Sequence, residues 1–234
     1  MSSTQEKVPF RLKYWVKPAL FLLGAVAVLV ASNIAYQALT TLKQLDGIEA
    51  DRDEWQRPSD VIQALSLKDG DSVVDLGCGS GYFSLKLSDP VGRSGKVIAE
   101  DVRRLSLSFL WMRALRKRKH NVSVHLGDLD DPRLRPGTIN AVLISNTYHE
   151  FTAARRILDH VRQSLVPGGR IVIIDRSPKG RQEQTASFQE HEISSEQVET
   201  DLRRASFQID TRTDHFIEND PEHETWWMIV AQRP

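Results

Sequence analysis

The residues with the clearest chemical potential lie between Asp75 and Gly81. An apolar run that begins at Val73 ends in Asp75, and glycine then stands at every second position. Glycine allows positive φ angles and lets a ligand approach the main chain, and the start of a following helix presents free N–H groups. An acid beside such a loop suits an amine-bearing or cationic ligand better than a pyrophosphate. The residues therefore predict a ligand site at the carboxyl end of a strand.

The elements that would position this loop alternate along the chain. Apolar runs predict strands at 71–76, 96–100, 122–125, 141–145, 170–175, 207–211 and 226–231. Amphipathic stretches predict helices at 59–65, 80–87, 103–119, 153–165 and 194–205. Strands that alternate with helices are typical of an α/β fold with a mostly parallel sheet covered on both faces. We therefore expect a seven-stranded sheet of this kind.

The loop has the spacing Asp-x-Gly-x-Gly-x-Gly, which differs from the dinucleotide fingerprint Gly-x-Gly-x-x-Gly. It resembles motif I of the class I S-adenosylmethionine-dependent methyltransferases. Later landmarks follow that family's order: Asp101 after the second strand, Gly127-Asp128 after the third, 145–151 after the fourth, and Leu-Val-Pro-Gly-Gly-Arg at 165–170. The resemblance covers about residues 52–234. The sequence is similar to the small-molecule branch of this family, which is related to quinone-biosynthesis methyltransferases. Within that branch, segments 52–58 and 146–149 are similar to a bacterial subgroup. The resemblance implies a Rossmann-like fold and S-adenosyl-L-methionine as cofactor.

The same resemblance implies how the cofactor is held. Asp75 would order the loop and hold the methionine amine, directly or through water. Asp101 would accept both ribose hydroxyls; its neighbour Glu100 is the alternative, although adjacent strand residues face opposite sides. Asp128 would accept from the adenine amino group, with Leu129 lining the ring. The expected cofactor-binding residues are Asp75, Gly77, Cys78, Gly79, Gly81, Asp101, Asp128, Leu129 and Asn146.

The segment after the fourth strand holds the candidate catalytic residues. The resemblance places Asn146 near the transferred methyl group, which would move by in-line displacement at the sulfonium while the protein positions both partners. His149 is the candidate general base because imidazole titrates near neutral pH. Glu150 would orient it or act itself, and Tyr148 would stack on a planar acceptor. A purely structural role for His149 stays open, because a nucleophilic acceptor needs no base, and His191 is a further candidate.

Composition excludes several classes of function. The chain has 234 residues, with 31 basic and 31 acidic side chains and a formal net charge of zero. Dedicated nucleic-acid binders carry a basic excess, so no nucleic-acid partner is expected. The single cysteine, Cys78, cannot form an internal disulfide or a multi-thiolate metal site. We expect no metal, and no arsenic methylation of the kind that uses several thiols.

Three further features leave alternatives open. Two residues depart from the family's pattern: Asn140 stands where Asp often precedes the fourth strand, and Ser206 where Gly commonly precedes the Phe of the sixth. Trp55 would either form part of a lid or pack. The helix expected at 103–119 has basic residues at 113 and 116–119 and apolar residues at 107, 110, 111 and 115. These predict either a solvated face over a core stripe or contact with anionic lipid.

The segment from Pro18 to Leu42 contains no charged residue. About 20 apolar residues suffice to cross a bilayer as a helix, and Trp15 and Tyr36 stand near its ends, where aromatic rings favour the interface. A cleaved signal peptide would have a shorter apolar region and a cleavage site. We expect four parts: a basic tail at 1–17, a transmembrane anchor at 18–39, a linker at 40–57 and a methyltransferase domain at 58–234.

Two features bear on the orientation of the chain in the membrane. Basic residues at 7, 11, 13 and 17 favour a cytoplasmic N-terminus, whereas S-adenosylmethionine is made in the cytosol and favours a cytoplasmic domain. We expect a single-pass membrane protein with the domain in the cytoplasm. Its predicted function is methyl transfer to a small or lipid-like acceptor. The alternative is a membrane-tethered cofactor-binding assembly or regulatory protein without catalysis, and the glycine spacing disfavours an NAD-dependent oxidoreductase. The oligomeric state is left open.

Overall fold

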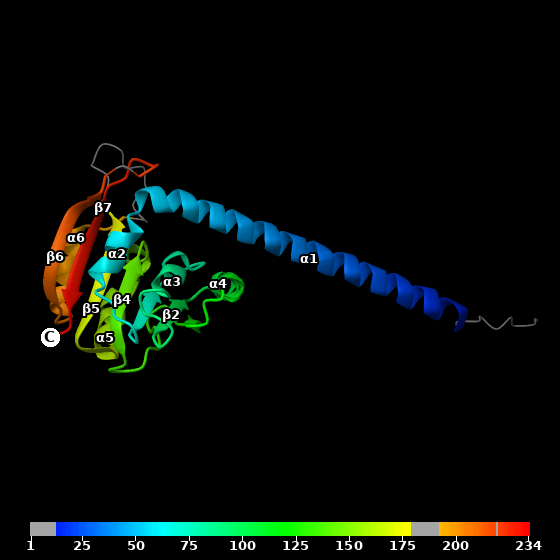
Figure 1. The fold of residues 1–234 in the computed structure, drawn as a ribbon, viewed down its shortest axis with the longest axis horizontal. Helices are drawn as coiled ribbons and strands as arrows, with labels where there is room; N and C mark the ends of the chain where they lie inside the picture. The colour runs from blue at the N-terminus through cyan, green and yellow to red at the C-terminus, as the bar shows by residue number, and fades with distance from the viewer. Residues whose placement is uncertain (1–12, 179–191, 219) are drawn as a thin grey trace, which may run out of the picture. The chain divides into compact units, whose positions relative to one another are not determined.

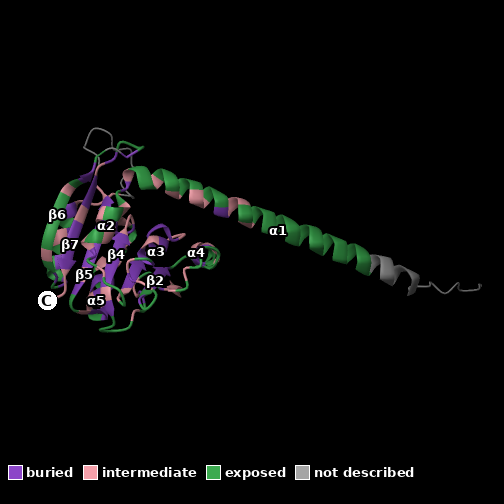
Figure 2. Cartoon of the chain, viewed as in Figure 1, coloured by how far each residue is buried: buried purple, intermediate pink, exposed green. Residues whose placement is uncertain are grey.

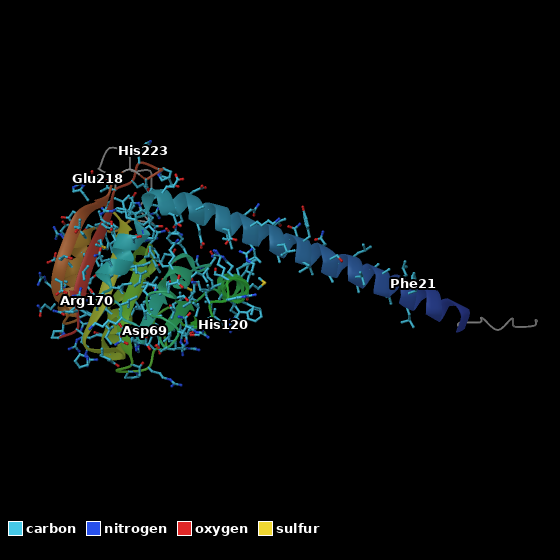
Figure 3. All side chains as sticks on the ribbon, in the orientation of Figure 1. Phe21, Asp69, His120, Arg170, Glu218 and His223 are labelled. Carbon is cyan, nitrogen blue, oxygen red and sulfur yellow. The ribbon has the colours of Figure 1, made fainter. Side chains whose placement is uncertain are left out.

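The computed structural model describes residues 13–178, 192–218 and 220–234. It divides into two compact units, residues 1–47 and 48–234. The described part of the first unit belongs to helix α1 (Lys13–Trp55), whose final turns lie in the second unit. The apolar side chains from Leu20 to Tyr36 are exposed, and Phe21 projects from the helix with 81% of its surface accessible (Figure 3). By length and composition alone, this helix is a candidate membrane span.

Residues 40–55 are helical, which differs from the expected linker. The segment contains two Leu, two Glu and single Lys, Gln, Ala and Arg residues, which are good helix formers, and its three Asp and one Gly do not interrupt α1. The helix ends at Trp55 because a residue before proline is disfavoured in the helical region. Arg57 accordingly adopts φ 51°, and Pro58 opens helix α2 (Pro58–Ala64). The second compact unit begins at Ile48, within α1.

The second unit is built on a seven-stranded sheet, with strand order β3-β2-β1-β4-β5-β7-β6 (Figure 1). The strands are β1 (Ser72–Leu76), β2 (Lys96–Asp101), β3 (Val122–Leu126), β4 (Ile139–Ser145), β5 (Leu165–Arg176), β6 (Gln208–Ile217) and β7 (Trp226–Gln232). The first five are parallel, and β7 runs antiparallel to both neighbours. This confirms the prediction of a Rossmann-like, mostly parallel sheet.

Helices cover both faces of this sheet, and the central strands β1, β4, β5 and β7 are largely buried, whereas the edge strand β6 is mostly exposed (Figure 2). Alternate side chains of β1 point to opposite faces, as strand geometry requires. Val74 packs with Leu158 of α5 (Ala154–Ser164) and Leu202 of α6 (Ser195–Arg204). Val73 packs in the cluster on the other face, which includes α2 and α3 (Tyr82–Leu87). A third cluster seats α4 (Arg104–Arg116) beside β2 and β3.

The chain changes direction across the sheet between β1 and β4. Strands β2 and β3 extend from one side of β1, and β4 and β5 from the other. The carboxyl ends of the central strands meet there, with Leu76 paired to Glu100 of β2 and to Ile144 of β4. Open α/β sheets bind ligands at this switch point. The fold therefore brings the loops after β1, β2 and β4 to one place.

Candidate functional site

The glycine loop after β1 has the backbone geometry that its sequence predicts. Gly77 has φ 74°, and a Cβ added there would collide with the Thr147 side chain. Gly79 has φ 54°, but its added Cβ would meet no atom within 4 Å. The Gly77 N–H donates to the Glu100 carbonyl at 2.9 Å, and the Gly79 N–H to Asp101 Oδ2 at 2.8 Å. The loop is thus anchored on β2 while Gly79 leaves space in front of it.

Two adjoining cavities open at this loop and share four lining residues, Gly77, Arg103, Thr147 and Glu150. The first has a volume of about 310 Å³ and is also lined by Arg52, Asp75, Cys78, Gly79, Ser80, Tyr82, Phe83, Ser145 and Asn146. The second has a volume of about 70 Å³ and is also lined by Asp101, Val102, Asp128, Leu129, Phe151 and Ile157. The first lies within the size range of ligand pockets.

Acceptor atoms dominate one wall of the first cavity. Asp75 is buried and accepts a hydrogen bond from Ser84 Oγ at 2.5 Å. Burial raises the pKa of its carboxyl to about 6, although the hydrogen bonds from Ser84 oppose the rise. Asn146 adopts φ 52° at the end of β4. Its Oδ1 and the Ser145 Oγ are buried without a hydrogen-bond partner among the described residues. Buried polar atoms are nearly always satisfied, so this wall calls for a ligand that donates hydrogen bonds.

A cation faces these acceptors from the end of α1. Arg52 lines the first cavity; its Nε donates to Gln56 Oε1 at 2.6 Å, and its guanidinium lies 4.0 Å from the centre of the Tyr82 ring. The ring and the amide hold the guanidinium in place. Arg52 is absent from the residues predicted from the sequence, because the loop it faces lies more than 20 residues further along the chain. Its place in segment 52–58 was the only signal.

The same helical end is tied to the back of the glycine loop. Arg113 of α4 is fully buried, forms an ion pair with Glu49, and donates from Nη1 to the Ser80 carbonyl at 2.7 Å. The sequence placed Arg113 in a basic cluster on the helix surface. It is instead an internal residue, because its guanidinium has a carboxylate and a backbone carbonyl as partners.

The second cavity holds the residues expected for ribose and adenine. Asp101 is 2% exposed and accepts from the backbone N–H of Gly79 at 2.8 Å and of Arg103 at 2.7 Å. A carboxylate has about four lone-pair positions, so it retains capacity for a ligand. Asp128 lies at the rim in an ion pair with Arg133 at 2.5 Å, and Leu129 is 69% exposed.

Glu100 points away from both cavities, as strand alternation predicts for the neighbour of Asp101. Its carboxylate lies against Gly127, where an added Cβ would overlap it. Burial is the main reason that its pKa rises to about 8, and the charges of Asp101 and Asp75 add to the rise. Of these two neighbouring acids, the structure places Asp101 at the second cavity.

The three candidate catalytic residues form the short 3₁₀ helix η1 (Tyr148–Glu150), and they face different ways. Tyr148 is 1% exposed, donates to Asp201 Oδ2 at 3.2 Å and packs on Phe151. It lines neither cavity, which corrects the expected stacking on an acceptor: an amphipathic ring with a buried hydroxyl partner belongs to the core. Glu150 lines both cavities and is half-exposed.

His149 is buried and lines neither cavity. Its Nδ1 lies 2.8 Å from Asp175 Oδ1, and its backbone N–H donates to Asp175 Oδ2 at 3.2 Å. Its Nε2 lies 4.0 Å from Glu150 Oε1. Asp175, fully buried at the end of β5, is a residue that sequence reasoning missed. The sequence did offer one indication of its importance: Asp175 follows an apolar run near the end of β5, as Asp75 follows one in β1.

The remaining candidates have simpler environments. Cys78 lines the first cavity, and burial raises the pKa of its thiol, so the side chain fills space in the loop. Trp55 packs on Trp226 with ring centres 5.7 Å apart, which favours packing over a lid. Ser72 donates its backbone N–H to Asn140 Oδ1 at 2.9 Å, so Asn140 is structural. His191 lies outside the described residues.

The chain is similar to known proteins in both sequence and fold. A family model described as a methyltransferase domain matches residues 67–230. The chain belongs to this methyltransferase family. A 37.1 kDa protein of a Streptomyces fradiae transposon is 32% identical over 116 residues, covering 48% of this chain and 32% of that protein. A demethylmenaquinone methyltransferase of Oceanobacillus iheyensis is 24% identical over 123 residues, covering 53% of this chain and 51% of the relative. The chain thus spans about half, or less, of these curated relatives.

A solved structure shares the fold. The S-adenosylmethionine-dependent methyltransferase from Aquifex aeolicus superposes with a TM-score of 0.70 at 24% identity, covering 83% of this chain and 98% of that one. Family and fold together confirm the resemblance seen in the sequence and support S-adenosylmethionine as the cofactor. The site of this methyltransferase-family chain fits that group: its first cavity offers unpaired acceptors and one cation, and its second an acid beside apolar side chains.

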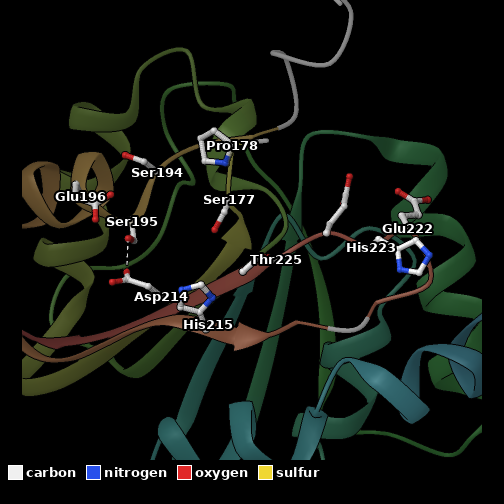
Figure 4. A pocket seen from close by; sticks show the side chains of 11 residues that line it. Ser177, Pro178, Ser194, Ser195, Glu196, Asp214, His215, Glu222, His223 and Thr225 are labelled. Carbon is white, nitrogen blue, oxygen red and sulfur yellow. Dashed lines mark hydrogen bonds between the residues drawn. The ribbon is translucent and has the colours of Figure 1, made fainter. Parts of the chain in front are cut away.

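A cavity larger than these two lies elsewhere and shares no lining residue with them. Its volume is about 820 Å³, and it lies beyond β5 beside β6 and β7 (Figure 4). Within it, Ser195 Oγ donates to Asp214 at 2.5 Å. Volume alone does not make it the methyl-transfer site, because it lacks the glycine loop. Among the described residues, no group of three or more His, Cys, Asp or Glu side chains is placed to hold a metal.

Proposed function

We propose that this chain transfers a methyl group from S-adenosylmethionine to a small or lipid-like acceptor, with the domain tethered to a membrane by α1. The observation that carries the proposal is that the unpartnered Asn146 Oδ1 and the buried Asp75 line the same cavity at the glycine loop. Together they require a ligand that donates hydrogen bonds and carries positive charge. The cofactor supplies an electrophilic methyl group on a sulfonium, which needs positioning rather than activation.

The first cavity would hold the amino-acid end of the cofactor. Asp75 and Asn146 would accept from its ammonium group, and Arg52 would pair with its carboxylate. A guanidinium is suited to this pairing because its fork of N–H donors matches a carboxylate. The ring of Tyr82 and the amide of Gln56 orient that fork, so little side-chain freedom is lost on binding. Gly79 provides the open space in which the ligand would lie against the main chain.

The second cavity would hold the nucleoside end. Asp101 would accept from the ribose hydroxyls while the N–H groups of Gly79 and Arg103 keep its carboxylate in place. Leu129 and Phe151 would cover the adenine ring, and Asp128 would accept from its amino group. The nine cofactor-binding residues expected from the sequence, with Arg52 added, make up this proposal.

Glu150 is the group best placed to accept a proton from the acceptor, because its side chain lines both cavities. His149 would act behind it: Asp175 orients the imidazole through Nδ1, which leaves Nε2 directed toward Glu150. A proton released on methyl transfer would pass to the Glu150 carboxylate, and Nε2 of the imidazole would accept a hydrogen bond from the carboxyl group so formed. In this arrangement His149 and Asp175 are positioning residues rather than the direct base.

The names of relatives and the candidate span in α1 support a small or lipid-like acceptor. Several relatives are named for quinone biosynthesis, such as the one from Oceanobacillus iheyensis, and one is an arsenite methyltransferase from Halobacterium salinarum. Arsenic chemistry built on several thiols does not suit a chain whose single cysteine is buried. A lipid-like acceptor agrees with the candidate span in α1. Cytosolic supply of the cofactor places the domain on the cytoplasmic side.

Calorimetric titration of the detergent-solubilised full chain with S-adenosylmethionine and S-adenosylhomocysteine tests the site. We expect micromolar binding, with a loss of about 10- to 100-fold for Arg52→Gln, Asp101→Asn and Asn146→Ala, since a hydrogen bond to a charged group contributes about 1.5–3 kcal/mol. Asp159→Asn, which removes one partner of an exposed ion pair, is the matched control and should bind as the parent does. Equal binding by all variants would reject the site.

The alternative function is that of a tethered cofactor-binding protein without catalysis. The burial of His149 favours this alternative, because the imidazole does not line the cavities. Transfer of tritiated methyl groups from the cofactor into membrane extracts separates the two. Binding without transfer to any extract would favour the alternative. A reporter fused after Pro234 tests the side of the membrane, and activity only outside the cytoplasm would contradict the enzymatic proposal.

A further inference from the structure

Helix α4 carries a second apolar face, which no other described element covers. Its inner face, at Leu107, Leu110 and Ala114, packs in the third core cluster. Outside this inner face Leu105 is 70%, Leu115 60% and Trp111, at the edge nearest Leu107, 58% exposed. Phe109 and Met112, which helical spacing places on the same side, are partly exposed. Several large apolar side chains exposed on one helix are typical of an interaction surface rather than of a solvated helix.

Positive charge flanks this face without acidic residues in the same segment. From Val102 to Gly127 the sequence contains no Asp or Glu, although the whole chain is neutral. Arg104 at the start of α4 and residues 116–118 at its end are exposed. His120, labelled in Figure 3, closes the basic segment. The buried Arg113 belongs to the core and takes no part in this surface.

We propose that this face of α4, defined by Leu105, Phe109, Trp111, Met112 and Leu115, docks on an anionic lipid surface. Apolar and aromatic side chains on one side of a helix with Lys and Arg beside them match the interfacial helices that lie in the headgroup region. Each basic residue near an anionic bilayer contributes about 1 kcal/mol. The charge selects this occupant over a second copy of the chain, since pairing two such faces brings like charges together.

The docking is distinct from the membrane tether. The candidate span lies in α1, whereas α4 packs on β2 and β3 in the second unit. The surface would hold the domain against the bilayer in one orientation, a constraint that a tether alone does not impose. It also differs from cofactor binding, because none of its five apolar residues lines either cavity at the glycine loop.

The test uses the full chain with its native thiol removed by Cys78→Ala and a fluorescent probe attached through Trp111→Cys. The matched control places the probe through Thr211→Cys, an exposed position on β6. Each protein is mixed with vesicles of phosphatidylcholine, with or without phosphatidylglycerol, that contain lipids brominated on their acyl chains. We expect a blue shift and quenching at position 111 on anionic vesicles, a large reduction of both on neutral vesicles, and neither at position 211.

Two triple charge-reversal variants test whether the basic residues at the end of α4 are needed for docking. Arg116→Glu, Lys117→Glu and Arg118→Glu combined should abolish the quenching at position 111. Lys68→Glu, Arg93→Glu and Lys96→Glu combined, which change the net charge equally at other exposed positions, should leave it intact.

Three results would overturn the docking: equal quenching at 111 and 211, the same quenching on neutral and anionic vesicles, or a probe shift at 111 that rises with protein concentration without vesicles. The last would assign the face to a second copy. Cofactor titration of the parent full chain, with Cys78 intact, reports separately on the proposed function, so failure of one proposal does not mask the other.

Discussion

The glycine loop and helix η1 both follow central strands of the same sheet, yet their residues behave differently. The loop after β1 lies at two adjoining cavities, which Asp75, Gly77 and Gly79 line, whereas Gly81 lies against Leu110 and lines neither. In η1, three consecutive candidates face three environments: Tyr148 the core, His149 a buried carboxylate, and Glu150 the cavities.

The difference lies in what determines each geometry. In the loop the backbone forms the site and adopts positive φ angles. Because glycine adopts such angles readily, its spacing in the sequence indicates this backbone geometry. In η1 each side chain is directed by a distant partner: Asp201 of α6 holds Tyr148, and Asp175 of β5 holds His149. A motif of consecutive residues does not reveal which of them meets which partner.

Within η1, the largest expected effect belongs to Glu150. Glu150→Gln should lower methyl transfer by about 10²–10⁴-fold, the usual contribution of a positioned acid or base, with little change in stability. Tyr148→Phe should instead leave transfer unchanged and cost about 1 kcal/mol of unfolding free energy, because it removes one hydrogen bond. Tritium transfer and urea unfolding of both variants measure these effects. Loss of transfer in Tyr148→Phe with Glu150→Gln active would reverse the assignment.

Two alanine substitutions separate stability from binding in the glycine loop. Gly77→Ala should lower stability by about 2–4 kcal/mol, combining the left-handed backbone penalty with overpacking against Thr147. Gly79→Ala should cost only about 1 kcal/mol, since its Cβ meets open space, yet it should abolish cofactor binding by filling that space. Thermal unfolding and calorimetry distinguish them. Retained binding by Gly79→Ala would mean that the ligand does not approach this residue.

Cofactor affinity should depend on pH through Asp75. Its carboxyl has a pKa raised to about 6 by burial. A cationic ligand favours the ionised form, so protonation competes with binding. Affinity should therefore be steady from pH 7 down to about 6 and then fall about tenfold per pH unit. Titrations between pH 5 and 7 should show this slope in the parent and not in Asp75→Asn. The same slope in the variant would assign it to another group.

The smallest effect is expected at Ser206, where the family commonly has glycine. Ser206 follows α6 with φ 62°, and its N–H donates to the Arg203 carbonyl at 3.0 Å. The left-handed conformation costs about 1–2 kcal/mol outside glycine, and glycine loses about 0.5–1 kcal/mol in backbone entropy. Ser206→Gly should therefore raise stability by up to about 1 kcal/mol in urea unfolding. A lower stability would show that the serine side chain contributes more than its backbone costs.

Helix α4 shows the same division between local pattern and tertiary contact. One of its two interpretations from the sequence was a core stripe that included Trp111 and Leu115 under a solvated basic face that included Arg113; the other was contact with anionic lipid. The structure exposes Trp111 and Leu115 and buries Arg113 against Glu49. Periodicity alone could not distinguish the two apolar faces, since both have helical spacing. The partner that draws Arg113 inward comes from α1, far away in the sequence.

The seven strands, their alternation with helices and the acid-glycine loop can be predicted from local patterns, because hydrophobic periodicity and glycine spacing are local properties. Tertiary contacts fix the rest: α1 continues to Trp55 and brings Arg52 to the first cavity, Asp175 engages His149, and Glu150 rather than Tyr148 lines the ligand space. These outcomes depend on contacts between residues far apart in the chain. Such contacts arise from packing, and no local pattern of residue types encodes them.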